Sequence, residues 1–179
     1  GFVTLIGRPN VGKSTLMNML YGLLEPTEGK ILIREKEVKL KSPIDAIAHG
    51  IGMVHQEFML IPGFTVTENI KVGREKTMPN LVSRLFGPSM ESLDLKAMRR
   101  DARKALKTIG LQIEEYVKVA GLPVGYMQFI EIARELDKTG IQILVFDEPT
   151  AVLTESEAER LLEAMRVISS QGIAIIFIT

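Results

Sequence analysis

The feature that most constrains this chain is a glycine-rich segment near its N-terminus that fits the pattern G-x-x-x-x-G-K-[ST]. A short β-rich run at 2–6 precedes the segment, and apolar residues at helical spacing follow it as far as Leu24. We therefore expect a phosphate-binding loop between a strand and a helix, where backbone N–H groups and the helix N-terminus face a phosphate chain. The predicted loop comprises Gly7, Arg8, Pro9, Asn10, Val11, Gly12, Lys13, Ser14 and Thr15.

Two side chains of this loop have predicted contacts with a bound nucleotide. We expect Lys13 to reach the β- and γ-phosphates, and the hydroxyl of Ser14 to coordinate Mg²⁺. The alternative is a glycine-rich turn that matches the pattern by chance. A strand, the motif and a helix that follow one another in register favour the phosphate loop.

A second candidate part of the same site is the acidic pair Asp147 and Glu148, which follows the apolar run 143–146. At the carboxyl end of a buried strand, these acids would lie beside the phosphate loop. Asp147 would hold Mg²⁺ through water, and Glu148 could polarise the attacking water. Taken alone, the pair also fits an ordinary acidic exit from a strand; the phosphate loop makes that interpretation the weaker one.

The apolar strands predict an α/β fold. They are continuous rather than alternating, which indicates a sheet that is covered on both faces. The strand–helix–strand order makes this sheet mostly parallel, and two short strands at 31–33 and 38–40 form a small antiparallel β element. The stretch 72–135 interrupts that order and is predicted to be a helical subdomain. The nucleotide-binding core would then comprise 1–71 and 136–179.

Local signals place several helix ends. Ser42 before a proline, Asp94, and Thr154 with a glutamate three residues later are predicted to cap helices. Gly110 and Gly172 are predicted to end two of them. Residues 72–93 lack periodicity and are expected to form loops with short helical pieces.

Composition excludes some functions. Lysine and arginine total 22, as do aspartate and glutamate, so the formal net charge is zero and no basic field indicates a nucleic-acid partner. Cysteine is absent, which excludes disulfides and thiolate metal sites. The longest apolar run, 173–178, has the length of a strand and is far shorter than a membrane span.

Several segments together resemble the ATP-binding-cassette (ABC) ATPases, in order and spacing along the whole chain. Residues 147–150, Asp-Glu-Pro-Thr, look like their Walker B segment, and 151–154 occupy the place of the D-loop. Val54-His55-Gln56, before 65–70, resembles the Q-loop. A segment about twenty residues before Asp147 is similar to the signature motif, with Leu122, Pro123, Val124, Gly125 and Gln128 as its matching residues.

The resemblance implies a transport ATPase of the P-loop NTPase (RecA-like, ABC) fold, with ATP and Mg²⁺ as cofactors. Two cassettes would close head to tail over two ATP molecules and drive transmembrane permease subunits from the cytoplasmic face of the membrane, where the cassette is peripheral. The amino-acid sequence of several segments resembles that of importers of simple sugars and nucleosides, in which two cassettes share one polypeptide. This chain would be most of the first cassette, truncated at both ends. By this analogy Gln56 would contact Mg²⁺ and the water; a solvated loop glutamine is an equally good interpretation.

Three residues or pairs depart from the family pattern. Asn10-Val11 stand where the loop usually has Gly-Ala or Gly-Ser, and 8–11 resemble the loop of ribosome-associated small GTPases. Pro123 replaces the usual serine of the signature, so both a hydroxyl and an N–H are lost. Thr154 replaces the usual aspartate of the D-loop.

These departures leave two alternatives. The first is a GTPase-like switch, but no asparagine begins an N-K-x-D motif that would read guanine. A D-x-x-G match occurs at 137–140, and Gly140 is interpreted there as a helix stop. The second is a truncated nucleotide-binding module without turnover; the isolated fragment is expected to be inactive or weak.

Overall fold

The computed structural model describes residues 2–5, 12–33, 35–87, 90–150 and 153–178. The chain forms two compact units, a sheet unit of Gly1–Met59 with Lys138–Thr179, and a helical unit of Leu60–Asp137. The domain division predicted from the sequence, with a helical subdomain at 72–135, stays a prediction; the compact helical unit also includes residues 60–71.

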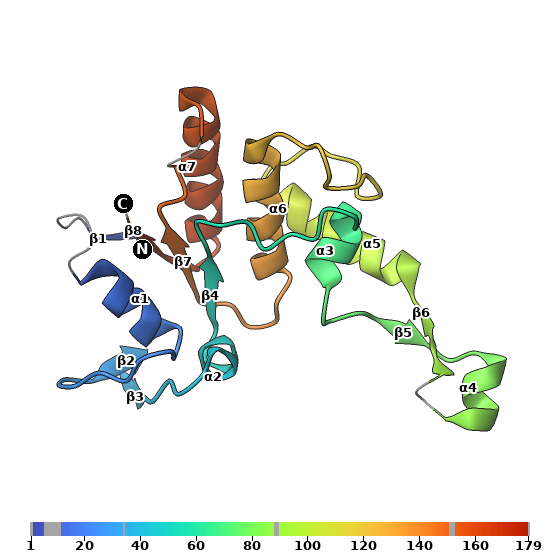
Figure 1. The fold of residues 1–179 in the computed structure, drawn as a ribbon, viewed down its shortest axis with the longest axis horizontal. Coiled ribbons are helices and arrows are strands. Elements are labelled where there is room, and N and C mark those ends of the chain that lie inside the picture. The colour runs from blue at the N-terminus through green and yellow to red at the C-terminus, as the bar shows by residue number, and fades with distance from the viewer. Residues whose placement is uncertain (1, 6–11, 34, 88–89, 151–152, 179) are drawn as a thin grey trace. The chain divides into compact units, whose positions relative to one another are not determined.

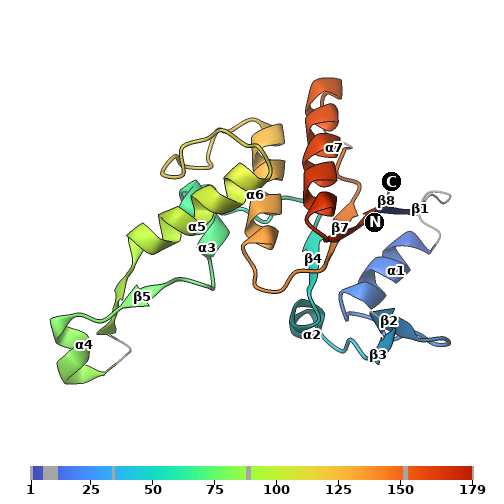
Figure 2. The same ribbon diagram turned by 180° about the vertical axis from the view of Figure 1, so that it is seen from behind.

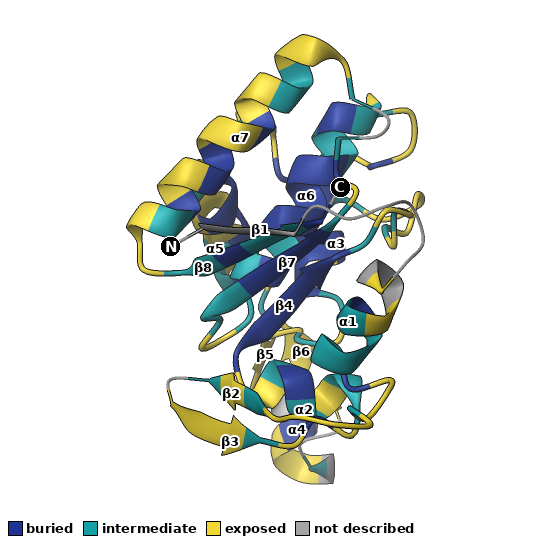
Figure 3. Ribbon diagram, turned by 90° about the vertical axis from the view of Figure 1, so that its left-hand side faces the viewer, coloured by how far each residue is buried: buried dark blue, intermediate teal, exposed yellow. Residues whose placement is uncertain are grey.

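The sheet unit is built on four parallel strands in the order β1-β8-β7-β4 (Figure 3). This arrangement confirms the predicted parallel sheet. The continuous apolar runs form the two middle strands and one edge strand of this sheet, and in the middle Leu144, Val145 and Phe146 are fully enclosed. The strand bounds are β1 (Phe2–Leu5), β4 (Ile51–Val54), β7 (Ile143–Asp147) and β8 (Ala174–Ile178).

Successive strand residues point to opposite faces, so strands that are apolar throughout make both faces of the sheet apolar. Helices cover these faces. On one face, Val145 belongs to a core that includes Met17 of α1 (Lys13–Leu20) and Ala46 of α2 (Pro43–Ala48). The helix α7 (Glu155–Ser170) packs against β8 and buries Leu161, Met165 and Ile168. Figures 1 and 3 show α1 and α7 on opposite sides of the sheet.

The small antiparallel element is a hairpin of β2 (Ile31–Ile33) and β3 (Lys36–Val38), with Ile31 opposite Val38. The first strand is confirmed, whereas the second was predicted at 38–40 and lies two residues earlier. The difference has a local cause: Glu35 takes a positive φ of 65°, so the hairpin closes in a tight turn.

The helical unit is a bundle of α3 (Val66–Lys71), α5 (Leu95–Thr108) and α6 (Val124–Leu136), which pack against one another. An extension leads from α3 into α5. It consists of β5 (Thr77–Met78), α4 (Leu81–Phe86) and β6 (Ser92–Leu93), and we call it the arm (Figures 1 and 2). The short helix was expected, but the ribbon was not, because strands of two residues leave no periodic signal.

The arm is held by the side chain of Asn80. Its Oδ1 accepts a hydrogen bond from the backbone N–H of Ser83 at 2.7 Å. Its Nδ2 donates to the backbone carbonyl of Met90 at 2.8 Å and to the hydroxyl of Ser92 at 2.7 Å. One polar side chain thus caps α4 and ties the start of that helix to the beginning of β6.

The predicted caps are confirmed at all three positions. The side chains of Ser42, Asp94 and Thr154 accept hydrogen bonds from the backbone N–H three residues later. The helix α3 was not predicted, although Thr65 and Glu68 form a reciprocal capping box at its start. The T-x-x-E pattern at 65–68 was the available signal.

A buried ion network joins the three helices of the helical unit. The ammonium of Lys71 lies 3.0 Å from Asp137 Oδ2 and 3.1 Å from Asp101 Oδ2. Arg74 Nη1 lies 2.7 Å from the same Asp137 oxygen. The side chains of Lys71 and Asp137 are only 5% and 7% exposed, so the charges satisfy one another instead of water.

Candidate functional site

The carboxyl ends of β1 and β7 meet at one edge of the sheet. Leu5 pairs with Ile178 of β8, and Ile178 pairs on its other side with Asp147. Since neighbouring strands lie about 4.8 Å apart, the main chains at Leu5 and Asp147 are separated by about 10 Å. Leu5 is two residues before Gly7 in the sequence. The acidic pair therefore lies at the edge where the predicted phosphate loop leaves the sheet.

Most of the predicted phosphate loop, from Gly7 to Val11, lies outside the described residues. The described part begins at Gly12, which caps α1 with a positive φ of 78°. In the described part of the chain, no side chain caps α1 and no acid occupies its first turn. The first backbone N–H groups of α1, at Lys13 and Ser14, thus remain available to an anion.

Asp147 is the partly buried acid of the site. It follows Val145 on the face of the sheet that α1 covers, because strand residues alternate. Burial raises the pKa of Asp147 above its ordinary value of 3.8, and the adjacent Glu148 raises it further. The charge of His55 acts in the opposite direction. Two neighbouring carboxyl groups with this balance are suited to a divalent cation.

Glu148 leaves the strand in an unusual backbone conformation. Its φ is 44°, in the left-handed region that residues other than glycine rarely adopt. Its backbone N–H donates to the carbonyl of Ile178 at 2.9 Å, which holds this conformation, and its side chain is exposed. Strained positions of this kind occur at sites where a side chain must be presented in one direction.

His55 lies at the site although its sequence context gave it no role. Val54 pairs with Phe146, so His55 comes next to Asp147 at the ends of the neighbouring strands. The rings of His55 and Tyr21 pack edge to face, with their centroids 5.5 Å apart and their planes at 87°. Tyr21 is the C-terminal cap of α1. Only the strand register, which a sequence does not reveal, brings these residues together.

Gln56 follows His55 and is exposed to solvent. This position is open to a ligand that would bind at the sheet edge. The catalytic and metal-binding roles predicted for Gln56 stay predictions.

The predicted signature residues lie around the start of α6, in the helical unit. Pro123 is the N-terminal cap residue of α6, and its carbonyl accepts from the N–H of Met127 at 3.2 Å. Pro123 is exposed, while Leu122 and Val124 are half-buried and Gly125 is buried. Gln128 is only 1% exposed, and its Nε2 has no hydrogen-bond partner among the described residues. Their contact with nucleotide stays a prediction.

The predicted D-loop is described only in part. Ala151 and Val152 lie outside the described residues, and Thr154 accepts from the N–H of Glu157 as the cap of α7. The predicted capping function of Thr154 is thus confirmed.

The D-x-x-G match at 137–140 has a structural explanation. Asp137 caps the end of α6 and binds Lys71, and Gly140 has a positive φ of 78°. Asp137 is thereby committed to the helical bundle, which weakens the GTPase interpretation.

Comparison with known proteins gives the family. The model of the family described as ABC transporter matches residues 1–151. This chain therefore belongs to the ABC transporter family.

The chain resembles curated import proteins over nearly its whole length. It is 42% identical over 175 residues to the nucleoside import ATP-binding protein NupA of Lactococcus lactis subsp. cremoris, covering 98% of this chain and 32% of that protein. It is 41% identical over 176 residues to the ribose import ATP-binding protein RbsA of Rhodopirellula baltica, with coverage of 98% and 32%. The chain thus spans about a third of the length of these relatives.

Solved structures show the same fold. MJ1267 in its ADP conformation, an ATP-binding cassette of an ABC transporter, has a TM-score of 0.77 at 26% identity, with coverage of 99% of this chain and 68% of that one. The dimeric post-hydrolysis state of the cassette MJ0796 bound to ADP and Pi has a TM-score of 0.67 at 25% identity, with coverage of 94% and 69%. The predicted ABC-type P-loop NTPase fold is confirmed. Within the described residues, no helix has the length and apolar character needed to cross a membrane.

Proposed function

We propose that this chain binds MgATP on its phosphate loop and, in a head-to-tail dimer with a second cassette, hydrolyses it to power import of a monosaccharide or nucleoside. The observation that carries the proposal is the row Leu5–Ile178–Asp147, which joins the exit toward the loop to the acidic pair at one sheet edge. Family membership and the import of ribose and nucleosides by named relatives support the substrate class.

The residues of the site suit a Mg²⁺ ion. Ser14, Asp147 and Gln56 would hold it, directly or through water, because oxygen ligands are those that this ion prefers. Burial and the adjacent Glu148 raise the pKa of Asp147, and a bound cation would offset both effects by favouring the carboxylate. When bound, the ion would neutralise charge on the phosphates.

The roles of the remaining side chains follow from their positions. Lys13, in the first turn of α1, would contact the β- and γ-phosphates together with the uncapped N–H groups of that helix. Glu148 would accept a proton from the attacking water, because its carboxylate is exposed just beyond the sheet edge. Gln56 would orient the same water.

The proposed assembly has two cassettes and transmembrane permease subunits, with this chain peripheral on the cytoplasmic face. The dimer of the similar cassette MJ0796, with ADP and Pi bound, supports the paired arrangement. In it, the signature of each cassette would complete the site on the other, so Pro123 and its neighbours would act on the partner's nucleotide.

The proposal is tested by transport with the full-length protein. The protein would be reconstituted with its permease in proteoliposomes, and uptake of labelled ribose and labelled nucleosides would be measured with and without MgATP. We expect ATP-dependent uptake of a member of one of these classes, which Glu148→Gln abolishes. Nucleotide binding with no ATP turnover, measured by phosphate release, would instead support the module without turnover.

A further inference from the structure

The solvent face of α5 is strongly basic. The helix has 14 residues, of which six are cationic and one, Asp101, is acidic. All six cations are exposed, and each has another cation three or four residues away, so they form a stripe about 17 Å long. We call it the basic stripe; its members are Lys96, Arg99, Arg100, Arg103, Lys104 and Lys107.

Among neighbouring acids, Glu115 acts on Arg99 and Arg103, and Glu114 acts on Arg103. Asp101 is bonded to Lys71 and Lys76, which lie outside the stripe. Arg103 Nη2 lies 2.6 Å from Glu115 Oε1. In the described part of the helical unit, the other five members of the stripe have no ion pair. Because the whole chain has a net charge of zero, the stripe is a local concentration of charge and no consequence of a basic protein.

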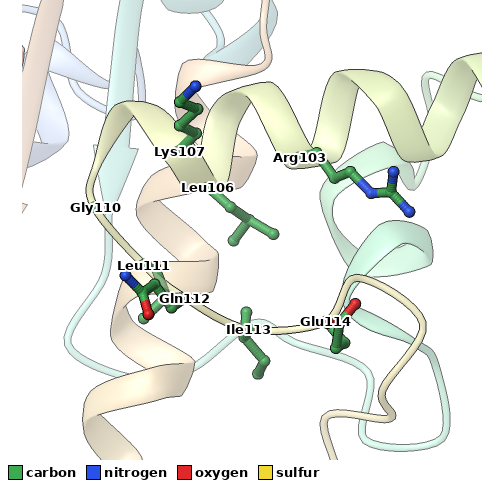
Figure 4. Close-up of a pocket in the computed structure, with 8 residues that line it drawn as sticks. All are labelled: Arg103, Leu106, Lys107, Gly110, Leu111, Gln112, Ile113 and Glu114. Atoms are coloured by element: carbon green, nitrogen blue, oxygen red, sulfur yellow. The ribbon is translucent and has the colours of Figure 1, made fainter.

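Two members of the stripe, Arg103 and Lys107, line a groove beside α5. Figure 4 shows α5 beside the loop of residues 110–114, with a groove of about 440 Å³ between them. Leu106 points from the helix toward that loop, and the six cations of the stripe are exposed. The apolar side of α5 is thus used for packing, and its cations remain accessible to an external anionic surface.

Exposed apolar side chains also occur on the arm, which leads into α5 in the same unit. Leu85 is 80% exposed, and Met78, Met90 and Leu93 are each about half exposed. Isolated exposed apolar residues are ordinary, but here several share one short extension. The strand β6 ends two residues before α5 begins, so the arm continues into the stripe without a linker (Figures 1 and 2).

We propose that the basic stripe and the arm together form a binding surface for an anionic lipid bilayer. Lysine and arginine gathered on one helix face bind acidic headgroups, and apolar side chains beside them enter the boundary between headgroups and acyl chains. A nucleic acid would satisfy the cations but would leave Leu85 and Met90 without apolar contact. This inference deepens the membrane association proposed above and does not depend on nucleotide binding or on a permease.

The test measures binding of the 179-residue chain to vesicles by co-sedimentation. We expect binding to vesicles in which phosphatidylcholine is mixed with the acidic lipid phosphatidylglycerol, and weak binding to phosphatidylcholine alone. Binding should weaken steeply as salt is raised. The triple change Arg99→Glu, Arg100→Glu and Lys104→Glu should lower the partition coefficient by about a hundredfold or more.

A matched control separates the stripe from net charge. Lys36, Lys39 and Lys41 are exposed lysines of the sheet unit, and changing all three to Glu alters the net charge by the same amount. This control should keep vesicle binding. Should it lose as much binding as the stripe variant, or should the unaltered chain fail to bind acidic vesicles, the proposal is overturned. The proposal is also overturned if the chain binds a DNA duplex through the stripe and does not bind acidic vesicles.

The apolar part of the proposal has its own pair of variants. Leu85→Glu should weaken vesicle binding at least several-fold, while Ile44→Glu in α2, where the side chain is 78% exposed, should not. Equal effects of the two would overturn insertion of the arm. Circular dichroism shows whether the triple glutamate variant folds. If it does not, the triple change Arg99→Gln, Arg100→Gln and Lys104→Gln provides the same test, because it removes the charges without reversing them. Retained binding by a folded glutamine triple would contradict the stripe as the binding surface.

Discussion

Asp147 lies level with Leu5 across a single intervening strand, because both pair with Ile178. This relationship places the end of the strand that leads to the phosphate loop opposite the end of the strand that carries the acids. Changes at the two places should therefore affect one nucleotide site in different ways.

Lys13→Ala should remove most nucleotide affinity and leave the fold intact. Lys13 is predicted to serve the phosphates, and its loss should weaken MgATP binding at least tenfold, about 1.4 kcal/mol. Equilibrium binding of a labelled nucleotide measures the effect, and Lys36→Ala, at an exposed position, is the control. Unchanged affinity in Lys13→Ala would show that this segment is no phosphate loop.

Glu148→Gln and Asp147→Asn should separate catalysis from metal binding. In the full-length protein, Glu148→Gln should retain ATP binding and lose about a hundredfold or more in turnover, because an amide cannot accept the proton of the attacking water. Asp147→Asn should instead weaken the Mg²⁺-dependent part of binding. Phosphate release and binding titrations with and without Mg²⁺ distinguish the two. Wild-type turnover in Glu148→Gln would contradict the role given to Glu148.

Lys71→Met should destabilise the helical unit by about 3 kcal/mol or more. Removing the buried ammonium leaves the carboxylate of Asp137, only 7% exposed, with Arg74 as its remaining cation, and loss of a partner from a buried ion network is costly. The control is Lys76→Met, because that lysine is 45% exposed and its pair with Asp101 should contribute about 1 kcal/mol or less. Urea unfolding measures both. Equal losses would mean that burial of the pair does not decide its contribution.

Stability should fall in acid. Hydrogen bonding from Lys76 lowers the pKa of Asp101 below its ordinary value of 3.8, and Arg103 lowers the pKa of Glu115 below 4.5. A lowered pKa in the folded state gives stabilisation that is complete above the unfolded value, and it is lost as the pH falls through the folded one. Unfolding free energies should thus decline from about pH 5 downward. Asp101→Asn should flatten that decline; an unchanged slope would exclude Asp101 as a source.

Pro123 should make the full-length ATPase asymmetric. Proline offers no hydroxyl or N–H, so the nucleotide that it faces, held by the partner cassette in the proposed dimer, should lack one contact. Pro123→Ser should then raise turnover at the partner's site, measured with Glu148→Gln silencing this chain's own site. If Pro123→Ser leaves that turnover unchanged, the head-to-tail arrangement fails for this protein.

The parts of the fold that sequence patterns predicted are those set by neighbours in the chain. The caps at Ser42, Asp94 and Thr154 and the apolar strands are local, and they are confirmed. The pair Lys71–Asp137 spans 66 residues, and it exists only because α3 and α6 pack together. The periodicity of apolar residues in the sequence does not predict such a pair.

The candidate site divides in the same way. Asp147 and Glu148 could be placed at a sheet edge because an apolar run precedes them. His55 could not, because its approach to Asp147 depends on the pairing of Val54 with Phe146. The arrangement of 7–11 lies outside the described residues, so the loop itself remains a prediction from its motif.

The order of strands in the sheet has a consequence for biosynthesis. Strand β1 is made before the other described strands, yet its partner β8 begins at Ala174. At about 5–20 residues per second on a ribosome, β1 waits roughly 10 to 30 s for that partner. The helical unit, by contrast, is one continuous stretch, Leu60–Asp137, and can fold while the sheet is still incomplete. Among the described strands, the one that leads into the predicted phosphate loop is thus synthesised before the others and must wait for β8 before the two can pair.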